Sequence, residues 1–239
     1  MQRKMFVGFA VLAVVLMTTP AWAEQSTEEE EETHTTFQVQ KTINGVPHVL
    51  LGVGAREATA LKINVYGAGL YVGIPQATKA WQSYLTGRFT KAGLIGADGA
   101  PDFAKLRTHR ELRHFVVYGN MPRAIEMQFV RNVSAEQVTN AYEESWARVK
   151  LDRTAAGEAL TQFMAAVNNP MTKGQTMSIN TVGNTINVQM PAGSKQIAGN
   201  VTFVRAVWQI WFGEPCLQAP LRDGMLSNVQ RLHDLASGS

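Results

Sequence analysis

Residues 46–72 read VPHVLLGVGAREATALKINVYGAGLYV, and two apolar runs in this stretch meet at Arg56 and Glu57. Runs rich in Val, Leu, Ile and Tyr that are bounded by Gly and Pro are typical of strands, so residues 46–53 and 61–72 are predicted to be strands. A guanidinium stays charged at physiological pH and is rarely buried among aliphatic side chains without an anionic partner. Arg56 therefore indicates where an anion is expected.

The second of these strands has two different faces. One face carries Leu61, Ile63, Val65, Gly67, Gly69 and Tyr71, and the other carries Lys62, Asn64, Tyr66 and Ala68. Because side chains alternate across a strand, Tyr66 is expected to lie beside the polar residues Lys62 and Asn64.

Other segments complete an α+β pattern. The predicted strands are residues 37–43, a hairpin of 112–118 and 123–131 through a turn at 119–122, and a hairpin of 176–182 and 185–189 through Gly183-Asn184. The predicted helices are residues 76–85, 134–150, 154–167 and 201–212, and a Gly-rich loop covers 87–101. Ser134 and Gln137 form a capping box at the clearest helix start. Strands at each end around a helical middle favour a mainly antiparallel sheet packed with helices.

The first residues indicate export. Residues 1–23 combine a basic start, an apolar stretch and Ala21-Trp22-Ala23, which has the form of a signal-peptidase site. The apolar stretch is shorter than the roughly 20 residues that a membrane-spanning helix needs. A cleaved signal peptide and a periplasmic or secreted product, with no transmembrane segment, are therefore expected. The lone Cys216 excludes an internal disulfide, so stability must come from the core of one domain over residues 37–239.

Charge is distributed in blocks. Residues 24–36 contain Glu24 and the run Glu28 to Glu32, which is typical of a disordered acidic tail. Basic residues gather in a predicted loop over 86–114, which includes Arg107, Arg110 and Arg113. An exported protein rarely meets nucleic acid, and aromatic residues are not interleaved there, so nucleic-acid binding is not expected. The basic loop is either a solvated surface or a contact for a protein partner.

Familiar cofactor signatures are missing. Gly52-x-Gly54 has no third glycine, no phosphate loop or Gly-x-Ser-x-Gly occurs, and the five histidines are not arranged at metal-ligand spacings. We therefore expect no cofactor and no metal.

Four strings resemble one known family in order and spacing. They are GVGAR (52–56), KINVYGAGLY (62–71), MPRAIEMQFVRNVSAE (121–136) and VRAVWQIWFG (204–213), and together they resemble the bacterial, exported branch of the chalcone isomerase-like family over residues 42–228. The resemblance implies an open-faced β-sandwich, in which a large antiparallel sheet and its helices form an apolar cleft. It also implies either enzymes that close chalcones to flavanones or non-catalytic relatives that bind fatty acids.

The same resemblance suggests residue roles. Arg56 matches an arginine that faces the ligand in both groups, and Tyr66 aligns with a tyrosine of the fatty-acid binders where the enzymes have threonine. Asn140 matches an asparagine of the enzymes' cleft, although the helical wheel groups it with Glu136 and Glu143. Val133 stands where the enzymes carry a tyrosine that orders water. Valine cannot hold that water.

Three functions follow from these features. The first is an exported, non-catalytic protein that binds a fatty-acid-like anionic ligand in an apolar cleft. Arg56 and Tyr66 would contact the head group, and Asn64 and Lys62 would either extend this polar site or face solvent. The second is a chalcone isomerase, an intramolecular lyase, in which Arg56 stabilises charge and Asn140 positions the substrate. The third is an interaction protein that binds a partner through residues 86–114.

Overall fold

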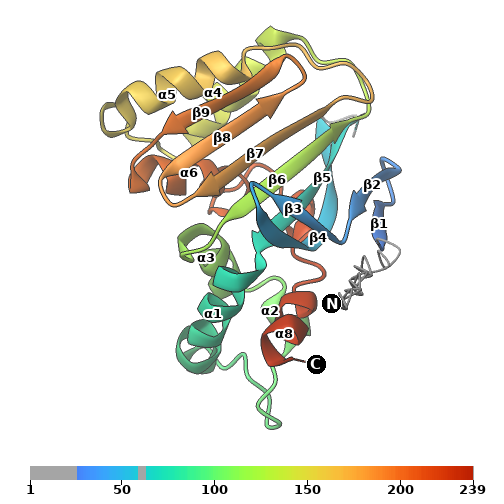
Figure 1. The fold of residues 1–239 in the computed structure, drawn as a ribbon, viewed down its shortest axis with the longest axis vertical. Coiled ribbons are helices and arrows are strands. Elements are labelled where there is room, and N and C mark those ends of the chain that lie inside the picture. Colours follow the sequence, from blue (N-terminus) through green and yellow to red (C-terminus); the bar gives the residue numbers. More distant parts are fainter. Residues whose placement is uncertain (1–25, 59–62, 239) are drawn as a thin grey trace, which may run out of the picture.

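The computed structural model describes residues 26–58 and 63–238. The expected signal peptide and Lys62 lie outside these residues. Within them, seven strands form one antiparallel sheet in which each strand pairs with its neighbours in sequence (Figure 1). In order, they are β3 (Gln40–Ile43), β4 (Val46–Ala58), β5 (Ile63–Gly73), β6 (Arg123–Phe129), β7 (Thr176–Val182), β8 (Thr185–Met190) and β9 (Gly193–Ala198). The sheet and its covering helices confirm the predicted α+β class.

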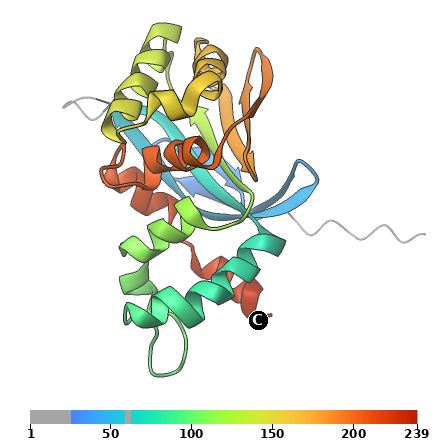
Figure 2. The ribbon, with the colours of Figure 1, turned by 90° about the vertical axis from the view of Figure 1, so that its left-hand side faces the viewer.

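Three helices cover one face of the sheet. They are α4 (Ala135–Arg148), α5 (Arg153–Val167) and α6 (Val201–Phe212), which Figure 2 shows on the same side of the strands. Beyond one end of the sheet lie α1 (Ile74–Tyr84), the π-helix η1 (Leu85–Phe89), α2 (Phe103–Leu106), α3 (Arg110–Tyr118) and α8 (Gln230–Ser237). A short helix, α7 (Ala219–Met225), packs on β4. No helix within the described residues is long and apolar enough to span a bilayer.

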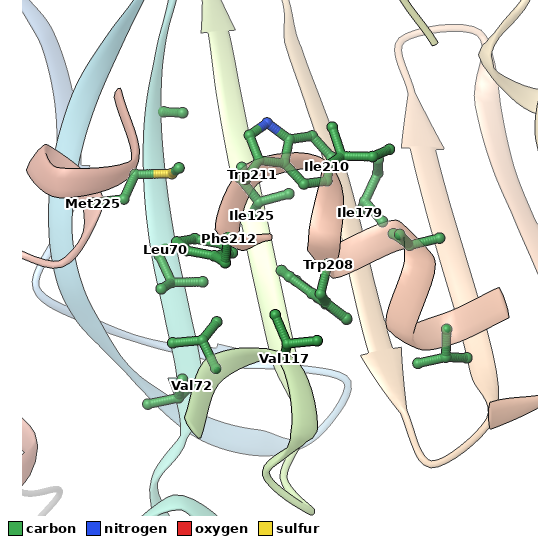
Figure 3. Packing of buried hydrophobic residues seen from close by; sticks show 14 of the residues in the cluster. Leu70, Val72, Val117, Ile125, Ile179, Trp208, Ile210, Trp211, Phe212 and Met225 are labelled. Atoms are coloured by element: carbon green, nitrogen blue, oxygen red, sulfur yellow. The ribbon is translucent and has the colours of Figure 1, made fainter. Parts of the chain in front are cut away.

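Local signals explain the two helices that matter most for the site. The capping box of α4 is present, because Ser134 and Gln137 each bond the other's backbone N–H. The Asn200 side chain caps α6 by accepting the Phe203 N–H at 2.8 Å. Figure 3 shows Trp208, Trp211 and Phe212 of α6 packed over strand residues that include Leu70, Ile125 and Ile179. Most of α6 is therefore buried, and the predicted helix over 201–212 is confirmed.

The predicted strand at 112–118 is wrong, because this segment belongs to helix α3. His109 caps the helix by accepting the Glu111 N–H at 3.2 Å. Leu112, Phe115 and Val116 are fully buried, and their three- and four-residue spacing places them on one helical face. The sheet therefore contains no hairpin through residues 119–122.

The segment 86–114 is helical in part, and residues 92–102 form the longest loop within it. It contains part of η1, all of α2 and the start of α3. Arg113 is buried, donates to the Thr108 carbonyl at 2.6 Å and forms an ion pair with Glu214, while Arg88 pairs with Glu111. Much of the predicted basic surface is thus neutralised within the protein.

The acidic segment also differs from the prediction of a disordered tail. Strands β1 (Thr27–Glu30) and β2 (Thr35–Gln38) form a hairpin. The carboxylate of Glu28 accepts hydrogen bonds from Asn228 and Arg231 near the other end of the chain. The hairpin lies closely against β5, where a Cβ at Gly67 would be 1.9 Å from the Thr35 hydroxyl oxygen. Specific partners, rather than solvent, therefore surround part of this charge.

Candidate functional site

A mainly apolar cavity of about 430 Å³ lies between α4, α6 and strands β4 to β7. Its apolar walls come from Ala58, Ile63, Val65, Met127, Phe129, Val133, Val138, Ala141, Met177, Ile210, Trp211 and Leu217. Its polar lining comes from Arg56, Tyr66, Arg131, Asn132, Gln137, Tyr142 and Ser145. The volume falls in the range of small-molecule sites, and a few polar groups in an apolar cavity are typical of such sites.

Arg56 lines this cavity without a carboxylate partner. Its Nη1 donates to the Glu57 backbone carbonyl and to Gln218 Oε1, the latter at 3.1 Å. Among the described residues, no carboxylate oxygen lies within ion-pair distance of the guanidinium. Neutral acceptors therefore hold Arg56 in place, and its positive charge stays available to an anion in the cavity.

The neighbouring glycine explains why Gln218 reaches Arg56. A Cβ at Gly54 would lie only 2.6 Å from the Leu221 carbonyl oxygen, so α7 packs against bare backbone at this point of β4. The residue before α7, Gln218, is brought to the end of the strand, where its Oε1 also accepts the Glu57 N–H at 3.1 Å. The Gly-x-Gly pattern thus serves helix packing, and this packing positions the arginine.

Tyr66 lies directly opposite Arg56 on β5 and is 8% exposed. Its ring packs on Phe129 with centroids 5.4 Å apart. Burial raises the pKa of the phenol, and the Trp211 indole and the Arg56 charge oppose part of that shift. At neutral pH the hydroxyl keeps its proton and can donate a hydrogen bond to an anion. Arg56 and Tyr66, both predicted as site residues, therefore line the same cavity.

The alternation predicted that Asn64 and Tyr66 share the same surroundings, and this prediction is wrong. The pairing of β4 and β5 shifts between Arg56 and Glu57, which disturbs the two-residue period at this end of the strand. Asn64 is not among the cavity residues, and its Nδ2 donates to the Glu32 carbonyl at 3.0 Å. In place of Asn64, Tyr66 has Phe129 and Trp211 beside it, and Arg56 lies opposite it on β4.

Asn140 is exposed and does not line the cavity. The cavity face of α4 carries Val138, Ala141, Tyr142 and Ser145, and Asn140 lies on another face of the helix. Val133, in contrast, does line the cavity. The position where the enzymes were expected to hold water therefore presents an aliphatic side chain.

Several cavity residues were not predicted from the sequence. Arg131, Asn132 and Gln137 are exposed polar residues at the edge of the cavity, while Met177 and Ser145 are buried in its wall. Val138, Ala141, Tyr142 and Ser145 are three or four residues apart and therefore share one face of α4. This spacing could have identified the part of the cavity wall that α4 forms.

A second, polar hollow of about 480 Å³ lies beside α3. Arg88, Arg113, Glu111 and Glu214 line it and pair with one another. His114 meets the Tyr84 hydroxyl at 2.8 Å, and its pKa is lowered by burial and by the nearby Arg88. Within residues 26–58 and 63–238, no cluster of three His, Cys, Asp or Glu side chains could hold a metal ion.

A curled antiparallel sheet with helices on one face and an apolar cavity beneath them defines an α+β fold. Residues 108–227, half of the chain, match the chalcone isomerase-like family, and the chain belongs to that family. The predicted family is thus confirmed.

A solved structure supports the same fold. The chain is similar to the crystal structure of a fatty-acid binding protein from Arabidopsis thaliana, with a TM-score of 0.66 and 19% sequence identity. The alignment covers 89% of this chain and 100% of the plant protein. At this identity the similarity establishes the fold, which agrees with the predicted chalcone isomerase type. No curated protein is similar enough to count as a match.

Proposed function

We propose that this protein binds an anionic amphiphile, of which a fatty acid is the simplest example, in the apolar cavity and does not transform it. The observation that carries the proposal is Arg56, a cation without an ion-pair partner among the described residues that lines a mainly apolar cavity. A carboxylate accepts two parallel hydrogen bonds from a guanidinium, which is a strong and specific contact. A plant protein with the same fold is named for fatty-acid binding.

The cavity suits the remainder of such a ligand. Its wall is formed largely by aliphatic, methionine and aromatic side chains, and an alkyl chain gains about 0.8 kcal/mol for each methylene removed from water. Methionines such as Met127 and Met177 adapt to flexible chains. Head-group contact at Arg56 and apolar contact along the cavity thus act on the two ends of one amphiphile.

Two positions support a non-catalytic role. Val133 lines the cavity where a water-ordering tyrosine would be needed for ring closure, and valine offers no hydrogen bond. Asn140, which the isomerase hypothesis required, is exposed on α4. Arg56 could still stabilise an anion, but the partners that would turn such binding into isomerisation are missing from the cavity wall described here.

We also propose that the protein acts after export. The support is the sequence of residues 1–23, with its basic start, apolar stretch and Ala21-Trp22-Ala23. Expression of the full-length chain in a bacterium, followed by fractionation and N-terminal sequencing, tests this. The proposal requires a periplasmic or secreted product that begins near Glu24, and a cytoplasmic product that keeps residue 1 would contradict it.

Binding and catalysis are tested on the same purified protein. The protein is titrated with dodecanoate in a calorimeter, and the cyclisation of a chalcone is followed by absorbance with and without protein. We expect saturable binding of dodecanoate that Arg56→Gln weakens, while Arg153→Gln, in an exposed ion pair on α5, does not. Cyclisation well above the spontaneous rate would refute the non-catalytic role. If neither ligand binds, the interaction-protein hypothesis takes its place.

A further inference from the structure

The indole N–H of Trp211 is a buried donor without a normal hydrogen bond. Trp211 is 2% exposed, and no acceptor among the described residues completes such a bond with its Nε1. The other tryptophans in this part of the chain do have acceptors. Trp81 donates to His233 Nδ1 at 3.3 Å, Trp146 to Met164 Sδ at 3.2 Å and Trp208 to Thr181 Oγ1 at 3.0 Å.

A buried polar group without a partner costs free energy, so native structures rarely keep one unless a ligand or water satisfies it. Trp211 lines the cavity, and Figure 3 shows its nitrogen on the ring edge turned away from Trp208 and Phe212. The indole N–H also points toward the Tyr66 hydroxyl, and the weak hydrogen bond between them, which does not meet normal distance and angle limits, opposes part of the rise in the pKa of that phenol. The unsatisfied donor is thus beside a residue of the proposed head-group site.

Three side chains in this region can therefore donate hydrogen bonds to one ligand group. The Arg56 guanidinium and the Trp211 indole are donors only, and Tyr66 can donate its hydroxyl proton. Tyr66 links the other two, because it pairs with Arg56 across β4 and β5 and lies near Trp211 of α6. A group with several lone pairs and no protons satisfies all three donors, whereas an alkylamine, which is protonated at neutral pH and then has no lone pair, satisfies none of them.

We propose that Trp211 is a specificity-determining residue of the binding site, whose N–H donates to the carboxylate of the ligand together with Arg56 and Tyr66. The inference rests on the proposed function and adds to it a preference for carboxylates over alcohols and amines of the same chain length. In the free protein the N–H contributes no complete hydrogen bond to the fold. Its removal should therefore affect binding much more than stability.

Trp208→Phe is the matched control, because it makes the same change on the same helix, away from the cavity lining. Trp208 N–H donates to Thr181, whose side chain is 1% exposed and would lose its partner. The two variants should give opposite results. Trp211→Phe should weaken dodecanoate binding about 10-fold or more, as expected for a lost hydrogen bond to a charged group, and leave dodecanol binding nearly unchanged. Trp208→Phe should keep the affinity and lower Tm about 2–4 °C more than Trp211→Phe does.

The experiment titrates wild-type protein and both variants with dodecanoate, dodecanol and dodecylamine, and records Tm without ligand. In parallel, ¹H–¹⁵N spectra of the wild type follow the indole N–H signals during the dodecanoate titration. We expect the Trp211 signal to move downfield and the Trp208 signal to stay. This measurement needs no variant, so it tests whether the Trp211 N–H contacts the ligand even where a substitution impairs folding.

The outcomes separate the two proposals. If wild-type protein does not bind dodecanoate, the proposed function and this inference both fail. If dodecanoate binds, but the Trp211 signal is unchanged and Trp211→Phe loses dodecanoate and dodecanol affinity equally, only the role of Trp211 is overturned. A selective loss for dodecanoate with a shifted indole signal supports it.

Discussion

Ser145 offers a direct way to fill the cavity from its α4 wall. Its side chain lines the cavity, the residue is 3% exposed, and its hydroxyl donates to the Ala141 carbonyl of the same helix at 2.7 Å. That carbonyl also belongs to the helical hydrogen-bond pattern, so loss of the hydroxyl leaves it satisfied. Ser145→Leu therefore adds apolar volume to the site without creating a buried polar group that lacks a partner.

The expected effects can be worked out from the atoms that change. Leucine adds three carbon atoms in place of the hydroxyl oxygen, which is about 2.4 kcal/mol of apolar burial at about 0.8 kcal/mol for each carbon. The lost hydroxyl bond offsets about 1 kcal/mol of this. The free protein should gain about 1 kcal/mol of stability, or about 2–4 °C in Tm. A ligand chain excluded from the same space should lose about 2.4 kcal/mol, or about 50-fold in affinity.

Thermal unfolding and calorimetric titration with dodecanoate measure the two effects. Ser145→Ala is the control, because it removes the hydroxyl without filling the cavity, and it should change dodecanoate affinity less than about threefold. If Ser145→Leu lowers Tm and leaves affinity unchanged, the space beside Ser145 is not where the ligand chain lies, and the reasoning is refuted.

Three further predictions concern charge. Burial raises the pKa of Tyr66, so its contribution to stability is intact below about pH 10 and falls above it; Tyr66→Phe should reduce the alkaline loss of stability measured by urea unfolding. Glu28→Ala should cost about 1–2 kcal/mol because Asn228 loses its acceptor, whereas the exposed Glu31→Ala should change the unfolding free energy by less than about 0.5 kcal/mol. Arg131→Ala should weaken dodecanoate binding several-fold at low salt, and a salt-independent loss would contradict a purely electrostatic role.

The sequence and the family resemblance together placed Arg56 and Tyr66 at one site, and in the structure both line the same cavity. Arg56 was predicted because it is a cation between apolar strand-like runs, whereas Tyr66 was predicted because it aligns with a tyrosine of the fatty-acid binders. Asn140 was suggested by resemblance alone, and its helical phase, which groups it with glutamates, already pointed toward solvent. Where resemblance and periodicity disagreed, periodicity agreed with the structure.

The errors have a common physical origin, since each depends on contacts that are distant in sequence. Residues 112–118 satisfy both a strand and a helix pattern. Burial against α1 favours the helix, because the ring centroids of Phe115 and Trp81 lie 5.3 Å apart. Glu28 is ordered by partners about two hundred residues away. The incompletely bonded N–H of Trp211 depends on the orientation of one ring, which no local pattern encodes.

The central claim is that Arg56 meets the anionic end of a ligand whose chain lies in the cavity. A crystal structure of the protein with bound dodecanoate tests it most directly. The predicted result is a carboxylate oxygen about 3 Å from the Arg56 guanidinium, with the alkyl chain between Val138 and Met177. A carboxylate bound only at the exposed Arg131, with Arg56 still bonded only to Gln218 and the Glu57 carbonyl and the cavity unfilled, would contradict the claim.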